Sequence, residues 1–456
     1  MTNLSKLRLS QADKSFVWHP YTQMKDWQKM RNTVITSGEN FYLVDNRGNK
    51  YLDGIASMWC NVWGHGENEI TFKMLSQMKK FQHSTLFGLA SDPSVRLAAK
   101  LLKICKGMDK VFYSDNGSTA IEVAMKMALQ YWRNKGALKK THFISLKGGY
   151  HGDTIGAMSV GYVRDYFLAY QPLLKKVHRV PAPSMDAKSK TKASAIEVQR
   201  CIQKTEDVLR KNASKCSALI MESGAQIAGG VRIYPDRYQK EISKLCAKYD
   251  VLLILDEIAT AFGRLGNMIE YISQRSIPDI ACFGKALSAG YSPLAVTLTT
   301  SKIYRAFDGD YLEKKHFFHG HTFTGHALGC TAAIANLDLI KKNKLISQVR
   351  YNSQYIHNRL KEIHNSPVAS CVRHKGLLAA VDIKKDGKPI VYIKNKVPIG
   401  YYIMQESLKM GVFLRSLGST LIIIPPLAIP RTDLEFLMDV VINLIYKIEH
   451  QLQSCD

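Results

Sequence analysis

Hydrophobic and polar residues alternate along the chain with two different periods. In residues 39–54, ENFYLVDNRGNKYLDG, apolar and polar side chains alternate on both sides of an Asn-Arg-Gly turn, which predicts a β-hairpin. In residues 119–135, TAIEVAMKMALQYWRNK, apolar side chains recur at a helical spacing instead, which predicts a helix with one buried face.

Predicted strands and helices then alternate along the sequence. Residues 141–152 indicate a strand that leads into a glycine-rich loop, residues 216–223 another strand, and residues 238–250 a helix. Residues 251–257, VLLILDE, form an apolar run of strand length that ends in two carboxylates. Strands without polar alternation are typical of a sheet that is covered on both faces. We therefore predict an α/β fold with a mostly parallel sheet flanked by helices.

The pattern changes after about residue 335. A long helical segment is followed by GLLAAVDI at 376–383 and by GVFLRSLGSTLIIIPP at 411–426, which predicts a smaller α+β domain. We expect three parts: residues 1–55 joining the small domain, residues 56–335 as the large domain, and residues 336–456 as the C-terminal small domain.

Composition and charge limit the class of protein. The 456 residues are 46% hydrophobic, enough for a sizeable core. The net charge of +25 raises the hypothesis of a non-enzymatic nucleic-acid-binding protein. The basic residues are scattered, however, in short runs without interleaved aromatic residues, and this favours a solvated surface over a nucleic-acid partner.

Cysteine usage and the N-terminus indicate a cytoplasmic protein. The nine cysteines include no Cys-x-x-Cys pair, which predicts neither a disulfide framework nor a zinc site. The first twenty residues lack the apolar core of a signal peptide, and no apolar run reaches the roughly 18 residues of a membrane span. We expect no membrane partner.

Lys285 is the first candidate for chemistry. After Asp279 it is the only charged residue of the segment 278–300, PDIACFGKALSAGYSPLAVTLTT. Burial among small and apolar side chains lowers the pKa of an amine, so that part of it is neutral and nucleophilic and bonds covalently to a carbonyl carbon.

Two further features suit the same chemistry. Asp256 ends a predicted central strand, and SDNGST at 114–119 precedes a helix predicted to begin at Thr119, with a capping box between Thr119 and Glu122. The amides of Gly117 and Ser118 would form an anion site there. Pyridoxal phosphate needs a lysine for its aldehyde, a carboxylate for its ring nitrogen and an anion site for its phosphate.

Two alternatives fit less well. VLLILDE resembles the acidic strand of nucleotide triphosphatases, but Gly284-Lys285 is followed by Ala286, and Asp279 stands where the phosphate loop needs glycine. The histidines of HFFHGHTFTGH at 316–326 lack a carboxylate or cysteine at a familiar ligand spacing, so we expect no metal site.

The order and spacing of several motifs resemble one enzyme family. These motifs are WHPYTQM, DNGSTAIEVAMKMALQYW, YHGDTIGAMS, LDEIATAFGRLG, FGKALSAG, HGHTFTGHALGC and GVFLR. Together they resemble the class III aminotransferases of the fold-type-I pyridoxal-phosphate superfamily, over about residues 16 to 435.

The resemblance implies roles for residues around the cofactor pyridoxal 5′-phosphate. Lys285 would bind its aldehyde covalently and act as general base and acid, and Asp256 would pair with the ring nitrogen. Further cofactor contacts would come from Gly117 and Ser118 at the phosphate, Tyr150 and Ile258 on the two ring faces, Glu222 nearby, and Thr322 reaching the neighbouring subunit's cofactor.

The resemblance also implies a substrate pocket and a homodimer with shared active sites. Tyr21 would act beside Lys285, and Arg415 would anchor a substrate carboxylate. The other matching pocket positions are Trp59, Tyr150, Asp153, Arg264 and Gly320.

Within the family, WHPYT and AMKMALQYW favour a member of biotin biosynthesis that moves an amino group from S-adenosylmethionine to 8-amino-7-oxononanoate, giving 7,8-diaminononanoate. Lysine as donor, or another ω-aminotransferase activity, stays open. The sequence departs from the family pattern at Met58, Ser223 and His321, of which Met58 would lie near the substrate.

Overall fold

The computed structural model describes residues 9–183, 192–235, 237–393 and 396–453. Its largest sheet has seven strands in the order β4-β12-β11-β10-β7-β5-β6, and β12 alone runs antiparallel to its neighbours. The mostly parallel sheet predicted from the sequence is therefore confirmed. Its strands are β4 (Lys110–Ser114), β5 (His142–Leu146), β6 (His178–Val180), β7 (Cys216–Glu222), β10 (Leu252–Asp256), β11 (Ile280–Phe283) and β12 (Ala295–Thr299).

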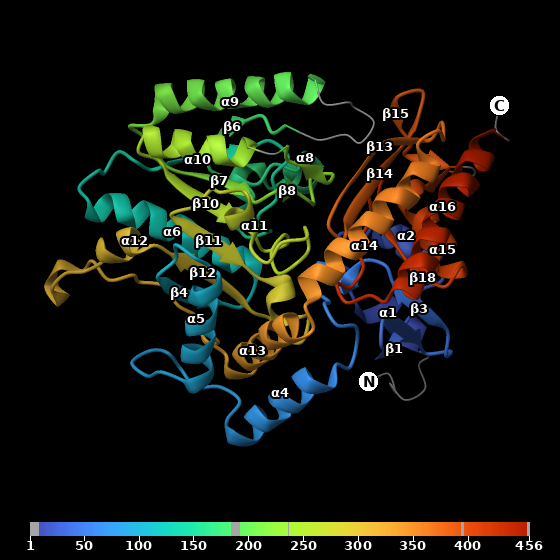
Figure 1. Ribbon diagram of the computed structural model, residues 1–456, viewed down its shortest axis with the longest axis horizontal. Helices are drawn as coiled ribbons and strands as arrows, with labels where there is room; N and C mark the ends of the chain where they lie inside the picture. Colours follow the sequence, from blue (N-terminus) through green and yellow to red (C-terminus); the bar gives the residue numbers. More distant parts are fainter. Residues whose placement is uncertain (1–8, 184–191, 236, 394–395, 454–456) are drawn as a thin grey trace.

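Both faces of this large sheet are buried, which explains why its strands are mostly apolar. In β10, Leu252 and Ile254 belong to one hydrophobic cluster, whereas Leu253 and Leu255 belong to another on the opposite face. Helix α6 (Gly117–Asn134) packs on the first face, and helix α10 (Tyr238–Lys248) contributes to the cluster on the second. Figure 1 shows the sheet between its helices.

The start of α6 differs from the prediction. The helix begins at Gly117 rather than Thr119, because the side chain of Asn116 accepts a hydrogen bond from the Thr119 amide at 3.1 Å and caps the first turn. Glu122 takes no part in the cap. Its Oε1 accepts hydrogen bonds from the Thr154 hydroxyl and from the Gly156 and Ala157 amides.

A smaller sheet, which we call the small sheet, lies beside the large one. Its strands follow the order β13-β14-β20-β19, and β15 pairs with β14. They are β13 (Ala369–Lys375), β14 (Leu378–Lys385), β15 (Lys388–Pro389), β19 (Arg415–Leu417) and β20 (Thr420–Ile423). Helices α14 (Leu345–Leu360), α15 (Ile399–Lys409) and α16 (Arg431–Gln453) pack around this sheet, in orange and red in Figure 1.

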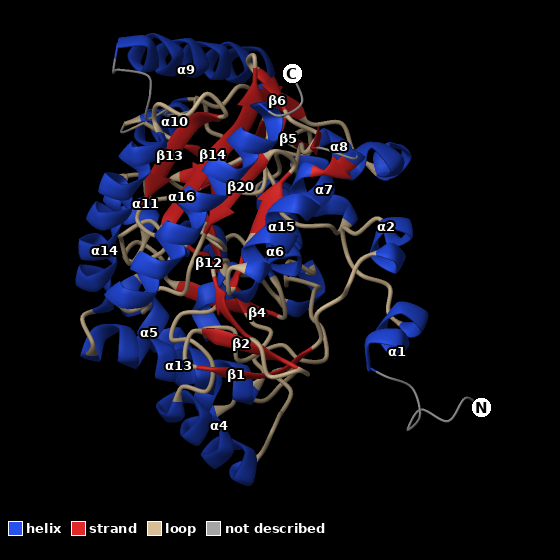
Figure 2. Ribbon diagram, turned by 90° about the vertical axis from the view of Figure 1, so that its right-hand side faces the viewer, coloured by secondary structure: helices blue, strands red, loops and turns tan. Residues whose placement is uncertain are grey.

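The N-terminal segment joins the C-terminal part of the chain. The predicted hairpin is confirmed as β2 (Tyr42–Asp45) and β3 (Lys50–Asp53), and β3 pairs in parallel with β18 (Val412–Phe413). Strand β1 (Ile35–Glu39) completes this sheet. Figure 2 shows the sheets in red among the helices. The three domain limits given above stay a prediction.

The remaining helices lie along the rest of the chain. Among them are α1 (Leu9–Phe16), α2 (Met24–Lys29), α4 (Asn68–Lys80), α5 (Asp92–Ile104), α7 (Ile155–Val160), α8 (Arg164–Phe167), α9 (Lys192–Asn212), α11 (Glu270–Ser273), α12 (Ser301–Arg305) and α13 (Ala327–Lys342). Within the described ranges, no helix combines the length and apolar character needed to cross a bilayer.

Candidate functional site

A cavity of about 450 Å³ lies where the central strands of the large sheet end. Ligands of open parallel sheets bind at this edge, because the loops after the strands converge there. The cavity brings together eight of the residues singled out in the sequence: Trp59, Gly117, Ser118, Tyr150, Glu222, Asp256, Ile258 and Lys285.

Lys285 reaches the cavity from the turn that follows β11. Its backbone has a φ of 44°, a conformation that residues other than glycine rarely adopt and that is often found at functional sites. Its Nζ lies 5.3 Å from the centre of the Trp59 ring. Burial lowers the pKa of the Lys285 amine, as the sequence predicted, and so increases its neutral, nucleophilic fraction.

Asp256 is the last residue of β10 and is only 5% exposed. Its Oδ1 accepts a hydrogen bond from the Ile258 amide at 2.9 Å. Its Oδ2 lies 2.8 Å from Nδ1 of His151, so the histidine donates to the carboxylate and fixes its orientation. A buried, oriented carboxylate of this kind suits a protonated ring nitrogen.

The first turn of α6 forms the other end of the cavity. Gly117 and Ser118 line it, and the Ser118 hydroxyl accepts a hydrogen bond from the Asp153 amide at 3.0 Å. Glycine is required beside it: a Cβ on Gly152, whose φ is +118°, would lie 1.8 Å from Ser118 Oγ. Free amides at the start of an 18-residue helix favour an anion.

Glu222 and Tyr150 border the cavity between these two ends. Glu222 accepts hydrogen bonds from the Tyr150 amide at 3.1 Å and the Ile227 amide at 2.9 Å, and burial raises its pKa to about 7. The Tyr150 and Tyr21 hydroxyls donate to the two oxygens of Asp153, at 2.9 and 2.6 Å. Asp153 therefore links Tyr21 to the cavity without lining it.

A second cavity of about 880 Å³ contains the predicted substrate residues Tyr21 and Arg415. Its walls come from the N-terminal segment and from the small sheet with its flanking helix α15, so distant parts of the sequence enclose it. Arg31, Arg415 and Asp165 supply charge to this second cavity. Aromatic and aliphatic side chains dominate the rest of its lining, among them Trp27, Met30, Ile35, Tyr51, Tyr401 and Phe413.

Besides Asp153, three predicted residues line neither cavity. Arg264 is 1% exposed, and its Nη1 donates to the carbonyls of Leu377 and Pro425 at 2.9 and 2.7 Å, while its Nε and Nη2 have no partner among the described residues. Gly320 and Thr322 are exposed on the loop before α13, where the Thr322 carbonyl accepts from His83 at 2.7 Å. Their roles stay predictions.

The sequence reasoning assigned no role to several residues of the cavity. His151 is the clearest case, since it holds Asp256 from a position next to Tyr150 in the same glycine-rich loop. Asn116, which caps α6, and Cys60, beside Trp59, also line the cavity. The described residues contain no group of three or more histidine, cysteine or acidic side chains that could hold a metal ion.

The side chains of the first cavity fit pyridoxal phosphate. Three features of the cavity match three parts of the cofactor. The Lys285 amine, whose pKa is lowered, matches the aldehyde, and the buried Asp256 carboxylate, held by His151, matches the ring nitrogen. The start of α6, bordered by glycine, matches the phosphate. A side chain at Gly117 would approach Ile258 Cδ1 to 2.9 Å, so glycine keeps the space beside Ile258 open.

Comparison with known proteins agrees with this fit. Residues 23–445 match the model of the family described as aminotransferase class-III. An adenosylmethionine-8-amino-7-oxononanoate aminotransferase of Geobacter sulfurreducens is 40% identical over 94% of this chain and 95% of its own. The crystal structure of the enzyme of that name from Methanocaldococcus jannaschii is 38% identical, covers 96% of this chain and 99% of its own, and has a TM-score of 0.88. An ω-transaminase variant from Pseudomonas jessenii is 25% identical, with a TM-score of 0.91 over 97% of this chain and 99% of its own.

Proposed function

The chain belongs to the class III aminotransferases, enzymes that use pyridoxal phosphate, and on that premise we propose that it transfers an amino group from S-adenosylmethionine to 8-amino-7-oxononanoate. The product would be 7,8-diaminononanoate, an intermediate of biotin biosynthesis. The observation that carries the proposal is near-full-length identity of 38% to 40% with relatives of that activity, joined to a cofactor cavity that contains Lys285, Asp256 and the start of α6.

The residues of the cavity have distinct roles in this proposal. When bound, pyridoxal phosphate withdraws electrons from the substrate carbon that loses its proton. Lys285 would hold the cofactor by its aldehyde, and its amine would take up and give back a proton at the substrate carbon. Asp256, held by His151, keeps the ring nitrogen protonated. Gly117 and Ser118 bind the phosphate, and Tyr150 and Ile258 border the ring.

The second cavity would hold the substrates. Arg415 binds the donor's carboxylate by a two-pronged contact and later the distant carboxylate of the acceptor, because the two substrates occupy the site in turn. Tyr21, tied to Asp153, and the ring of Trp59 are two aromatic surfaces that a sulfonium cation would contact. Arg264, Asp153 and Gly320 are further proposed contacts.

The proposed enzyme is a cytoplasmic homodimer. Thr322 is exposed on its loop and would complete the phosphate site of the neighbouring subunit. Mixing Lys285→Ala subunits with Thr322→Ala subunits should then restore one intact site per mixed dimer. Mixtures that exchange subunits but are no more active than either parent would contradict a shared site.

A second candidate is a broader ω-transaminase activity, which is favoured by the TM-score of 0.91 to the Pseudomonas jessenii enzyme. One experiment separates the two candidates. Purified protein receives 8-amino-7-oxononanoate with S-adenosylmethionine labelled with ¹⁵N at its α-amino group, and lysine or a simple primary amine is tested in parallel. Label in 7,8-diaminononanoate supports the proposal, whereas product from the simple amine alone supports the alternative.

A further inference from the structure

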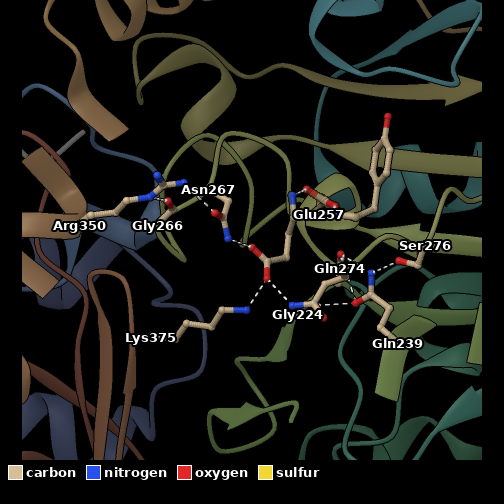
Figure 3. A network of polar contacts seen from close by, with 12 residues as sticks. Gly224, Gln239, Glu257, Gly266, Asn267, Gln274, Ser276, Arg350 and Lys375 are labelled. Atoms are coloured by element: carbon tan, nitrogen blue, oxygen red, sulfur yellow. Dashed lines mark hydrogen bonds and ion pairs between the residues drawn. The ribbon is translucent and has the colours of Figure 1, made fainter. Parts of the chain in front are cut away.

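Two fully buried carboxylates, Glu257 and Glu270, lie beside the cofactor cavity without lining it. Glu257 directly follows Asp256, and Glu270 is the first residue of α11. Neither has a part in the chemistry described above. Figure 3 shows the polar network around them, which Lys375 and Arg350 enter from the C-terminal part of the chain.

Glu257 connects the end of β10 to its neighbours. Its carboxylate accepts hydrogen bonds from the amide of Glu270 at 2.8 Å and from the amide of Tyr271 at 2.5 Å, so the start of α11 contacts it directly. Its own amide donates to the carbonyl of Cys282 in β11 at 2.8 Å. The residue next to Asp256 is therefore held from both sides, and α11 is part of that support.

Glu270 forms an ion pair with one cation among the described residues. Its Oε1 forms an ion pair with Lys375, the last residue of β13, and accepts a hydrogen bond from Gln274 at 2.8 Å. Its Oε2 accepts from Asn267 at 3.0 Å. Arg350 of α14 donates to the Asn267 side chain at 3.1 Å and to the Gly266 carbonyl at 2.8 Å.

The turn after Lys375 packs tightly against the same segment. A Cβ on Gly376, whose φ is +61°, would lie 2.4 Å from the carbonyl oxygen of Arg264. The next amide, that of Leu377, donates to this carbonyl at 3.0 Å. The β13–β14 turn therefore packs against residues 257–271. It joins the first two strands of the small sheet, and Arg415 begins β19 at the other end of the strand order.

We propose that Lys375 and Glu270 are positioning residues, which hold the segment after Asp256 against the small sheet and so fix Arg415 relative to the cofactor. The physical reason is the burial of Glu270: without Lys375 a buried carboxylate loses its counter-charge, and the structure around it rearranges to hydrate it. The proposal rests on the family's cofactor chemistry at Asp256 and on the proposed role of Arg415, and it does not depend on which donor is used.

The first test compares substrate affinity with turnover. In Lys375→Met, kcat/KM for the working donor should fall about tenfold or more, mainly through KM, because the anchoring wall moves while Lys285 and Asp256 stay in place. Lys375→Arg should restore KM. The matched control is Lys384→Met, which removes another small-sheet lysine of similar exposure that pairs with Asp382, and it should leave KM unchanged.

A double variant separates positioning from loss of stability. Lys375→Met with Glu270→Gln removes both charges of this pair, so it should unfold at a higher temperature than Lys375→Met alone. It still lacks the ion pair, so its KM should stay raised. A double variant with native KM would overturn the proposal.

The second test does not use turnover at all. Hydrogen exchange of the protein, with and without pyridoxal phosphate, should be faster at the Glu270 and Tyr271 amides in Lys375→Met than in the native chain or in Lys384→Met. Unchanged exchange at these amides, or an unchanged KM, would refute the positioning role. If the donor assignment fails but exchange rises, only the proposed substrate is wrong.

Discussion

The two cavities are built in different ways. The cofactor cavity lies on the strand ends of the large sheet, and two of its acidic groups, Asp256 and Glu222, are each 5% exposed and held by hydrogen bonds. The second cavity lies between the N-terminal segment and the small sheet, and Tyr21 in its wall is 55% exposed. Hydrogen bonds fix these groups of the first cavity, whereas the separation of the walls of the second depends on packing between distant segments.

This difference separates two kinds of specificity. Cofactor chemistry depends on groups that consecutive strands and one helix bring together, so it tolerates little change. In the proposed function, substrate choice would depend on the larger cavity, where aromatic and aliphatic surfaces outnumber charged groups, and a substitution there would change affinity before it changes chemistry. The predictions below test that separation.

The largest effect is expected for Lys285→Ala. Without the amine, both the covalent bond to the cofactor and the proton carrier are lost, and kcat should fall by more than about a thousandfold. Borohydride reduction followed by peptide mapping should place the cofactor on Lys285 in the native protein and on no lysine in the variant. A cofactor label on any other lysine would contradict the assignment of Lys285.

A smaller effect is expected for Arg415→Ala in the second cavity. Both half-reactions should weaken by about a hundredfold in kcat/KM, because the same guanidinium would bind the carboxylates of donor and acceptor. The visible absorption of the bound cofactor should not change, because Arg415 lies in the second cavity and not in the cofactor cavity. A variant that loses its cofactor would show that the two cavities are not separable.

Trp59→Leu should discriminate between donors. This change removes an aromatic face at the cofactor cavity but keeps an apolar side chain, and contacts of a cation with such a face contribute roughly 0.5 to 2 kcal/mol. The half-reaction with S-adenosylmethionine should slow by about tenfold. Equal slowing with lysine and with S-adenosylmethionine would show that the ring acts on Lys285 and not on the donor.

The smallest effect concerns stability of the small sheet. Burial, together with nearby His357, lowers the pKa of His374 to about 4, so the neutral form is favoured in the folded protein. The resulting stabilisation is complete above the unfolded pKa of about 6.5, declines progressively as pH falls below that value, and is fully lost once pH has fallen through about 4. In His374→Asn the melting temperature should therefore fall less between pH 7 and pH 5 than in the native protein. Parallel curves for the two proteins would contradict this account.

The sequence predicted more of the residues that line the first cavity than of those that line the second, for a physical reason. Lys285 follows a strand, Asp256 ends one and Gly117 begins a helix, and the carboxyl ends of parallel strands meet at one edge. The cap at Asn116 was missed because Thr119 and Glu122 also match a capping box, and only the fold shows that Glu122 binds the loop after residue 153.

Contacts between distant segments lay beyond local patterns. The ion pair of Lys375 and Glu270 joins residues 105 positions apart, and Arg264 is fixed by carbonyls 113 and 161 positions further on. No periodicity or motif specifies such pairings, since they arise when two sheets pack. His151 is different: it stood in a loop already singled out, and a buried carboxylate at a strand end calls for such a partner.

The most direct test of the central claim is a single-turnover measurement of amino transfer to the bound cofactor. The protein saturated with pyridoxal phosphate is mixed with S-adenosylmethionine or with lysine at equal concentration, and the conversion of the cofactor to its aminated form is followed by its visible absorption. We predict faster conversion with S-adenosylmethionine, and none in Lys285→Ala. Faster conversion with lysine would contradict the proposed donor, and conversion by Lys285→Ala would contradict the site itself.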